Sequence, residues 1–442
     1  MHLETRRNFL NRMKKYAPIP AQLFKGNRER LTACLKPNSV AILNANDEMP
    51  RSADGHFPFR QNSDLFWLTG IDQEQTTLVL FPDHPQPEMR EILFLRRTNE
   101  TIAVWEGHKY TEKEAREASG IQTIYWIDSL PDMLPGLMYL SQYCYLNTNE
   151  HTRMHSTVPD YDLRFARQMR EAFPLHTFER IAPIMHRLRA IKTQIEIDLL
   201  QTACNITEKA FRRVLGFVRP GVHEYEVEAE IVHEFLRNRA TGPAYGSIVA
   251  SGKNSCVLHY TSNNQVCRDG DVLLMDFGAE YANYAADLTR TIPISGKFTD
   301  RQRQVYNAVW RVMQQATDKL RPGVLLEEYQ KEVAGVMEQE LLSLGLLNAA
   351  DVAKQDPKKP LYKKYFMHGT SHFLGLDVHD VGLRHEPIRT GMVFTCEPGI
   401  YIPEEGIGIR LENDILVTDG KPYDLMHQIP LDPDEIEALM QQ

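Results

Sequence analysis

The 442-residue sequence predicts an α/β (α+β) protein in two parts, a smaller N-terminal α/β domain (residues 1–185) and a larger C-terminal domain (residues 186–442). Three observations support this prediction. Short apolar runs bounded by turn residues dominate the first part, and the composition changes to long amphipathic helices near residue 185. The remaining sequence contains an internal repeat. The chain also exceeds the usual size of one domain, which agrees with two units.

The first domain contains several apolar runs that end at Gly, Pro, Asn or Asp. Runs of this length with such boundaries are typical of β-strands. The predicted strands are SVAILNAN (39–46), LFWLTGI (65–71), TTLVLFPD (76–83) and REILFLRR (90–97).

The second domain begins with two amphipathic helices, followed by strands and then by another long helix. Apolar residues recur at helical spacing over 191–218 and 224–239, and Pro220-Gly221 separates the two stretches. The predicted strands are SIVAS (247–251), VLLMDFGAEY (272–281) and YAADLTRTIPI (284–294), and the next predicted helix is Gln302–Leu320.

This order of elements occurs twice. The tetrapeptide RPGV ends a long helix at residues 219–222 and again at residues 321–324. Downstream, RDGDVLLMDFGAEY (268–281) aligns with RTGMVFTCEPGIY (389–401), and the alignment places Asp276 on Glu397. The sequence therefore predicts two helix–helix–strand halves related by a pseudo-two-fold axis, each contributing acidic residues and a histidine to one shared cleft.

The two halves supply five candidate metal ligands, most of them hard oxygen donors. Four carboxylates and one imidazole are too many for one zinc ion, but they suit two divalent cations that share bridging carboxylates. The candidate ligands are Asp276, Asp287, His372, Glu397 and Glu412.

Asp276 and Asp287 are predicted to lie at matching ends of an antiparallel hairpin. The segment AEYANY between them has the character of a hairpin connection, and apolar runs flank both aspartates. Either aspartate alone would be more typical of a turn. Asp276, however, directly follows Leu-Leu-Met, where a carboxylate is costly unless a cation accompanies it.

Histidines and polar side chains cluster close to these carboxylates. His368, His372 and His379 lie within one apolar, glycine-punctuated segment, which favours a site over three unrelated histidines. Arg410 is separated by one residue from Glu412, so on a strand both side chains face the same side. The arginine could then orient the carboxylate or hold substrate.

Other catalytic motifs are incomplete. Asp276-Phe277-Gly278 matches the metal-binding tripeptide of protein kinases, but no HRD loop or VAIK motif accompanies it. The His-Glu pairs that begin at His223, His233 and His385 do not extend to HExxH, which excludes a zincin. Ser371 lies in GTSHF rather than in GxSxG, so a serine nucleophile is unsupported.

Charge and composition limit the partners. The net charge is −9 at pH 7, which argues against nucleic acid or an anionic membrane. No apolar run approaches the ~20 residues that span a bilayer. Six scattered cysteines without a CxxC pair indicate reduced thiols in the cytoplasm. The basic start, MHLETRRNFLNRMKKY, lacks the apolar core of a secretory signal; a surface helix is favoured over a mitochondrial presequence.

Motifs along nearly the whole chain resemble aminopeptidase P (Xaa-Pro aminopeptidase), a family of the pita-bread metallopeptidase superfamily. LHYTSNN, MDFGAEYANYAADLTRTIP, MHGTSHFLGLDVHDVG, GMVFTCEPGIYI and GIGIRLENDILVT resemble its metal-binding and catalytic motifs. RSADGHFPFRQNSDLFWLTG and PDEIEALM resemble its N-terminal signature and its C-terminal tail. The resemblance implies an N-terminal aminopeptidase P domain, followed by a duplicated catalytic domain with a curved antiparallel sheet.

The resemblance also implies a role for each site residue. Asp276 would hold one metal ion, His372 and Glu397 would hold the second, and Asp287 and Glu412 would bridge the two. The ions expected are Mn²⁺, with Co²⁺, Zn²⁺ or Fe²⁺ as alternatives. Glu397 would also act as general base, with the substrate and its transition state contacted by other side chains. These are His259, His379 and His368, supported by Arg410 and Tyr401.

The implied substrates are peptides with an N-terminal Xaa-Pro sequence, and the implied assembly is a homo-oligomer, a dimer or a tetramer. The chain departs from bacterial members of the family in a shorter loop between Glu397 and Arg410, filled by Pro-Glu-Glu-Gly. Three alternatives stay open: a prolidase that cleaves Xaa-Pro dipeptides, a methionine aminopeptidase, and a non-catalytic peptide-binding protein of the same fold. The N-terminal signature favours aminopeptidase P over prolidase, and methionine aminopeptidases normally lack such a large N-terminal domain. All five ligand positions carry the expected residue type, which argues against a non-catalytic protein.

Overall fold

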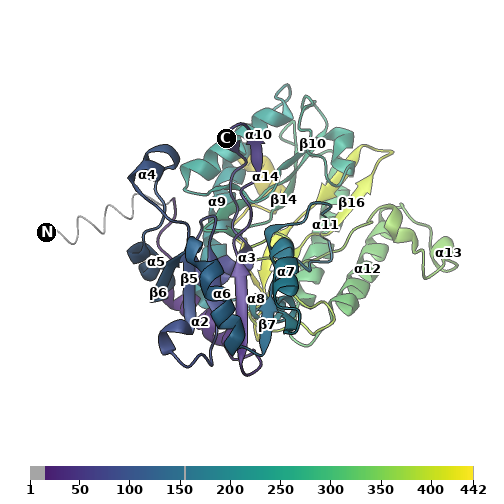
Figure 1. Cartoon of the computed structure of the whole chain (residues 1–442). Coiled ribbons are helices and arrows are strands. Elements are labelled where there is room, and N and C mark those ends of the chain that lie inside the picture. Colours follow the sequence, from purple (N-terminus) through teal and green to yellow (C-terminus); the bar gives the residue numbers. More distant parts are fainter. Residues whose placement is uncertain (1–14, 154–155, 442) are drawn as a thin grey trace. The chain divides into compact units, whose positions relative to one another are not determined.

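The computed structural model describes residues 15–153 and 156–441, which form two compact units (Figure 1). One unit comprises Ala17–Arg189, and the other comprises the chain from Ala190 onward together with Tyr16. Along the chain, the boundary after the first unit falls between residues 189 and 190, whereas the sequence predicts it between residues 185 and 186. The first fourteen residues, for which the sequence predicts a surface helix, lie outside the described residues.

The unit Ala17–Arg189 is built on one six-stranded mixed sheet with the order β6-β5-β4-β1-β7-β8. Its centre is the fully buried strand β1, which pairs antiparallel with β4 and parallel with β7. The strands are β1 (Ser39–Asn44), β4 (Thr77–Leu80), β5 (Glu91–Leu95), β6 (Thr123–Trp126), β7 (Tyr143–Leu146) and β8 (Thr177–Arg180). The helices are α2 (Ala21–Thr32), α3 (Ser63–Thr69), α4 (Glu100–Glu106), α5 (Glu112–Ser119), α6 (Leu130–Leu140), α7 (Tyr161–Ala172) and α8 (Ala182–Ala190).

The strand predicted at residues 65–71 is wrong, because this segment forms helix α3. The side chain of Asn62 caps the helix by accepting the backbone N–H groups of Asp64 and Leu65. Gly70 ends the helix in the left-handed conformation, with φ of 66°. All residues from Leu65 to Thr69 are buried. When every residue of a short segment is buried, the spacing of apolar residues does not distinguish a strand from a helix. The capping residues Asn62 and Gly70 are the features that favour a helix here.

The first half of the C-terminal unit begins with two helices that contact each other, α9 (Gln194–Leu215) and α10 (Glu224–Arg237). Strand β10 (Ile248–Ser251) then pairs with β11 (Val272–Asp276), which pairs with β14 (Thr289–Pro293). Between β11 and β14, strands β12 (Ala279–Tyr281) and β13 (Tyr284–Ala285) form an inner antiparallel pair. Ala282 and Asn283 turn this hairpin with φ of 52° and 67°, as expected for a tight two-residue connection.

The second half repeats this arrangement with α11 (Asp300–Lys319) and α12 (Leu326–Ser343), drawn in green in Figure 1. Strand β15 (Val393–Cys396) pairs with β18 (Asn413–Leu416), and β16 (Gly399–Ile402) pairs with β17 (Ile407–Arg410) inside them. The connection filled by Pro-Glu-Glu-Gly is the tight turn between β16 and β17. The predicted duplication is therefore present as two nested hairpins, each preceded by two helices.

The N-terminal unit also contains β2 (Pro50–Ser52), β3 (Gly55–His56), η1 (Pro87–Met89) and η2 (Ile127–Ser129). The C-terminal unit also contains β9 (Gly242–Pro243), η3 (Gly252–Cys256), α13 (Ala349–Val352), η4 (Leu361–Lys364), β19 (Tyr423–Asp424) and α14 (Pro433–Met440). Within the described part of the chain, no helix has the length and apolar character needed to traverse a bilayer.

Replacing Gly278 by alanine tests the close packing of the first hairpin. A Cβ at Gly278 would lie 1.7 Å from the backbone oxygen of Ala286, so the backbone must shift. We expect Gly278→Ala to lower the free energy of unfolding by about 3 kcal/mol, measured by denaturant titration of metal-free protein.

The matched control is Gly335→Ala in the interior of α12, where an added Cβ has no neighbour within 4 Å. The free energy of unfolding of this variant should be higher by about 0.5–1 kcal/mol, because alanine favours the helix more than glycine does. Equal unfolding free energies for the two variants would contradict the packing argument.

Candidate metal centre and active site

The four predicted carboxylate ligands lie where each nested hairpin changes from its outer to its inner strand pair. Asp276 ends β11, and Asp287 lies between β13 and β14. Glu397 follows β15, and Glu412 lies between β17 and β18. A bridge between Thr289 and Glu412 joins the two hairpins at this level. Segments more than a hundred residues apart in sequence therefore place their acidic side chains together.

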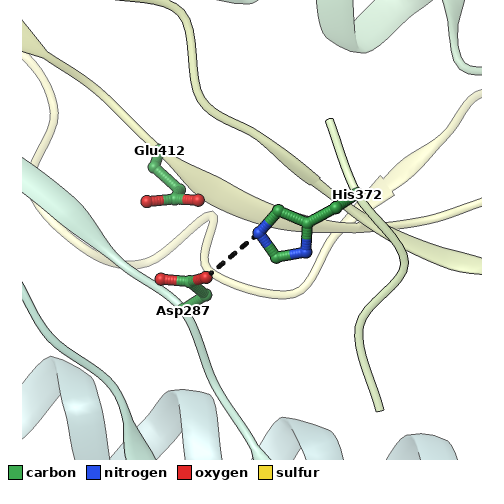
Figure 2. Close-up of side chains that lie close together, drawn as sticks. All are labelled: Asp287, His372 and Glu412. Carbon is green, nitrogen blue, oxygen red and sulfur yellow. Dashed lines mark ion pairs between the residues drawn. The ribbon is translucent and has the colours of Figure 1, made fainter. Parts of the chain in front are cut away.

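Figure 2 shows that the side chains of three predicted ligands, Asp287, His372 and Glu412, lie close together. One ligand atom from each of Asp287, His372 and Glu412 lies within 4.8 Å of the others, a spacing that one metal ion can bridge. His372 Nε2 lies 3.4 Å from Asp287 Oδ2, and all three residues are buried.

The other two predicted ligands flank this group on different sides. Glu397 Oε1 lies 3.8 Å from His372 Nε2. Asp276 is joined to Asp287 by the hydroxyl of Tyr245, which lies 2.6 Å from Asp276 Oδ1 and 2.5 Å from Asp287 Oδ1. The hydroxyl has one proton and can donate it to either carboxylate. The side chains of Asp276 and Glu397 are 14% and 21% exposed, whereas those of Asp287 and His372 are each 7% exposed.

Burial and mutual repulsion raise the pKa values of these carboxyl groups. Burial, with a contribution from the charge of Asp287, raises the pKa of Asp276 even though Arg410 lies beside it. Burial raises the pKa of Glu397 to about 7 and that of Glu412 well above its usual range. The site is thus short of positive charge, and divalent cations would supply it.

His372 is oriented for metal binding by its backbone. Its Nδ1 lies 3.0 Å from the carbonyl oxygen of Phe373, to which a protonated Nδ1 donates. The lone pair of Nε2 then faces Asp287 and Glu397, the arrangement usual for a metal-bound imidazole. Burial alone would lower the pKa of His372, but a hydrogen bond to Asp287 and the charge of Glu397 raise it. The segment around His372 is anchored to β15, where Thr395 N donates to His372 O.

Arg410 connects the predicted metal ligands to the predicted substrate side. Its Nη2 donates to Asp276 Oδ2 at 2.6 Å, its Nε to Thr289 Oγ1 at 3.0 Å, and its Nη1 to Tyr401 OH at 3.0 Å. Thr289 Oγ1 in turn donates to Glu412 Oε2 at 2.6 Å. One guanidinium therefore fixes a carboxylate from each hairpin, directly or through a hydroxyl.

His368 lies beside Tyr401 and Glu397. Its Nε2 is 2.8 Å from Tyr401 OH, and its Nδ1 is 3.7 Å from Glu397 Oε2. Burial, followed by the charge of Arg410, lowers the pKa of His368 to about 4. The imidazole is therefore neutral at neutral pH and can exchange hydrogen bonds without adding charge.

His379 lies edge-on to His372, with ring centroids 4.3 Å apart. A buried ion pair fixes the segment that carries both rings: Lys192 Nζ lies 3.2 Å from Asp380 Oδ2, and both side chains are at most 2% exposed. Gly375 permits this packing, since a Cβ there would lie 2.1 Å from Asp380 Oδ2.

His259 occupies an exposed loop after η3. Its neighbours Leu258 and Tyr260 pack against an apolar cluster that includes Tyr401. The charge of His259 contributes to the lowered pKa of His368, which places the two imidazoles in the same region.

Two contacting residues were not predicted from the sequence. Thr289 could have been found from the sequence, because it lies two residues after Asp287 in a predicted strand. Its side chain is therefore expected to point to the same face of the sheet as that of Asp287. Tyr245 has none, because it lies in the irregular segment before β10 and reaches Asp276 only through the fold.

Comparisons with known proteins identify the family of the chain. Residues 198–419 match metallopeptidase family M24, and residues 24–145 match the aminopeptidase P N-terminal domain. Xaa-Pro aminopeptidase of Escherichia coli (strain K12) is 37% identical, over 96% of this chain and 98% of its own length. The Xaa-Pro dipeptidase of Rattus norvegicus is 28% identical, over 96% of this chain and 94% of its own length.

Solved structures give the same result. A zinc-substituted E. coli aminopeptidase P in complex with product superimposes with a TM-score of 0.85 at 35% identity, covering 96% of this chain and 99% of that one. An aminopeptidase from Pseudomonas aeruginosa superimposes with a TM-score of 0.87 at 32% identity, covering 96% of this chain and 98% of that one.

The fold and the site define a two-unit metallopeptidase with a duplicated catalytic domain. The chain belongs to metallopeptidase family M24 and, within it, to the Xaa-Pro aminopeptidases. It is therefore a hydrolase of the pita-bread fold, as the sequence predicts.

The raised pKa values predict that metal binding releases protons. The pKa of Glu397, raised to about 7, keeps much of its carboxyl group protonated at pH 6.5 in the metal-free protein, and a cation must displace this proton. The pKa values of Glu412 and His372 are raised as well, which acts in the same direction. The apparent affinity for Mn²⁺ should therefore rise from pH 6 to pH 8, by up to about tenfold per pH unit for each proton displaced.

Calorimetric titration in two buffers of different ionisation enthalpy measures this release. More protons should leave at pH 6.5 than at pH 8, and Glu397→Gln should release fewer than the unmodified protein at pH 6.5. A proton count independent of pH would contradict the prediction.

Proposed function

We propose that the protein is a metal-dependent aminopeptidase that releases the N-terminal residue from peptides with proline in the second position. The observation that supports this most strongly is the group of four carboxylates and one imidazole in a chain of the Xaa-Pro aminopeptidase family. The site is poor in positive charge and rich in oxygen ligands, so its composition fits hard divalent cations.

Two metal ions are proposed, most simply Mn²⁺, with Co²⁺, Zn²⁺ or Fe²⁺ as alternatives. Asp276 would hold one ion, His372 and Glu397 the other, and Asp287 and Glu412 would lie between them. Metal ions bound there would lower the pKa of a water molecule and polarise the scissile carbonyl group. The contacts among Asp287, His372 and Glu412 support the bridging positions.

Glu397 is the proposed general base. Its carboxyl pKa of about 7 and its partial exposure suit a group that takes a proton from the attacking water near neutral pH. It would pass this proton to the proline nitrogen as the carbon–nitrogen bond breaks. Metal ions would lower this pKa, so the carboxylate form would dominate in the loaded enzyme.

The remaining predicted residues would hold the substrate. His368, neutral at the pH of the reaction, would line the side that receives proline, and Tyr401 and Arg410 would keep its orientation. His259 and His379 would contact the substrate carbonyl region and the charge that develops there. Proline forms a tertiary amide without an N–H group, so a dedicated site is chemically reasonable.

We also propose that the protein works in the cytoplasm as a homo-oligomer, a dimer or a tetramer. All six cysteines are free, in agreement with a reducing compartment. Sedimentation of the metal-loaded protein measures its assembly.

Peptide hydrolysis by Mn²⁺-loaded protein tests the proposal. We expect Xaa-Pro-Yaa peptides to lose their first residue, while Xaa-Ala-Yaa peptides and chelator-treated protein give no product. Hydrolysis confined to Xaa-Pro dipeptides would establish a prolidase instead. Bound metal without hydrolysis of either substrate would indicate a binding protein of this fold.

Replacing Glu397 by glutamine tests its role as base. The amide has the same shape but cannot accept the proton, so kcat should fall by about 10²–10⁴-fold while the fold is kept. The rate, the far-ultraviolet circular dichroism and the metal content are measured together. A variant with full metal content and full activity would contradict this assignment.

A further inference from the structure

A fully buried carboxylate at the start of α10 connects to the loop that carries His259. Glu224 is the first residue of α10 and has 0% exposure. Its Oε1 accepts from Ser251 N at 2.8 Å and Ser251 Oγ at 2.7 Å. Its Oε2 accepts from Tyr260 OH at 2.8 Å and Gln265 N at 2.9 Å. Four donors thus compensate a charge that would otherwise be costly to bury.

The same helix holds this loop at further points. Glu224 N donates to Gln265 O at 3.0 Å, so Gln265 is held through both its backbone groups. One turn along α10, Glu228 Oε2 accepts from Asn263 Nδ2 at 2.9 Å. Asn263 has φ of 42°, a left-handed conformation that its buried amide contacts fix. The end of the loop therefore takes its position from α10.

The beginning of the loop is fixed against the active site. Leu258 and Tyr260, on either side of His259, pack on a cluster of Ile248, Ala250, Leu274 and Tyr401. Tyr401 is the residue whose hydroxyl contacts His368 and Arg410. Tyr260 consequently belongs to both sets of contacts, with its ring on the cluster and its hydroxyl on Glu224.

We propose that Glu224 is a positioning residue that acts through Tyr260 and Gln265 to hold His259 in place for substrate. This inference rests on the proposed function, because it takes His259 as a substrate contact. Neither Glu224 nor Tyr260 needs to touch the substrate. A carboxylate suits this place because it accepts all four hydrogen bonds, whereas a glutamine would turn an N–H₂ group toward donors such as Gln265 N–H.

A double-mutant cycle between Tyr260 and His259 tests the proposal. Tyr260→Phe removes one donor and leaves the ring and the other three hydrogen bonds. We expect kcat/KM on an Xaa-Pro-Yaa peptide to fall about tenfold, the usual effect of one hydrogen bond to a charged group. In a His259→Ala background the same change should cost less than about twofold, since the residue being positioned is already absent.

The matched control is Tyr225→Phe. Tyr225 follows Glu224 on α10, but its side chain is exposed and stacks on His223. This change should leave kcat/KM within about twofold. Equal losses from Tyr260→Phe with and without His259 would overturn the proposal, because Tyr260 would then act independently of His259. Absence of any loss would overturn it as well.

Hydrogen exchange separates failure of this inference from failure of the proposed function. If the unmodified, Mn²⁺-loaded protein cleaves no Xaa-Pro peptide, the proposed function is wrong, and the connection to the loop is still measurable by mass spectrometry. Glu224→Gln should raise amide exchange in residues 257–266 by about tenfold or more, with smaller changes in α12. Unchanged exchange in that segment would overturn the proposal whatever the activity.

Discussion

The electrostatic repulsion among four carboxylates in one buried place is the constraint on which the catalytic unit depends. Arg410 and His372 lie directly against these carboxylates, and one guanidinium and one imidazole do not balance four carboxylates. Burial therefore raises the pKa values of several carboxyl groups in the metal-free protein. Cations stabilise the deprotonated form of these carboxyl groups. The affinity of the site for metal ions therefore follows from the way the fold brings the carboxyl groups together.

The scaffold holds these groups together by means that do not depend on the metal. The two hairpins are joined by backbone pairing between Thr289 and Glu412, and Gly278 permits the close approach within the first hairpin. The hydroxyl group of Tyr245 lies within hydrogen-bonding distance of both Asp276 and Asp287. Because these contacts are made between protein groups, they limit the rearrangement needed when a metal ion binds.

Features that leave a pattern in the sequence were predicted, and features that arise only from contacts in the fold were missed. The duplication was visible from the repeated tetrapeptide RPGV and from the alignment of residues 268–281 with residues 389–401, and the hairpin between Asp276 and Asp287 was visible from the segment that connects them. The strand predicted at residues 65–71 is wrong, because a short buried run does not distinguish helix from strand. Tyr245 was missed because no motif near it in the sequence indicates its contact with Asp276, which lies 31 residues away. The roles of the individual site residues stay predictions.

The registers of the two hairpins explain why the duplicated site is not symmetric. Asp276 pairs with Thr289, and the register that pairs Cys396 with Asn413 likewise places Glu397 opposite Glu412. Further along the hairpins, Gly399 pairs with Arg410, and the equivalent position to Arg410 in the first half is Asp287.

The duplicated scaffold thus offers three pairs of equivalent positions: Asp276 and Glu397, Asp287 and Arg410, and Thr289 and Glu412. Carboxylates in all six would repel one another without any fixed positive charge. The chain places a hydroxyl at one position and a guanidinium at another, and these two side chains are hydrogen-bonded to each other. The departures from symmetry therefore limit the number of carboxylates in the site to four, and Arg410 and Thr289 donate hydrogen bonds to two of them, Asp276 and Glu412. The asymmetry also gives the site two distinct ends, which a substrate with a defined direction requires.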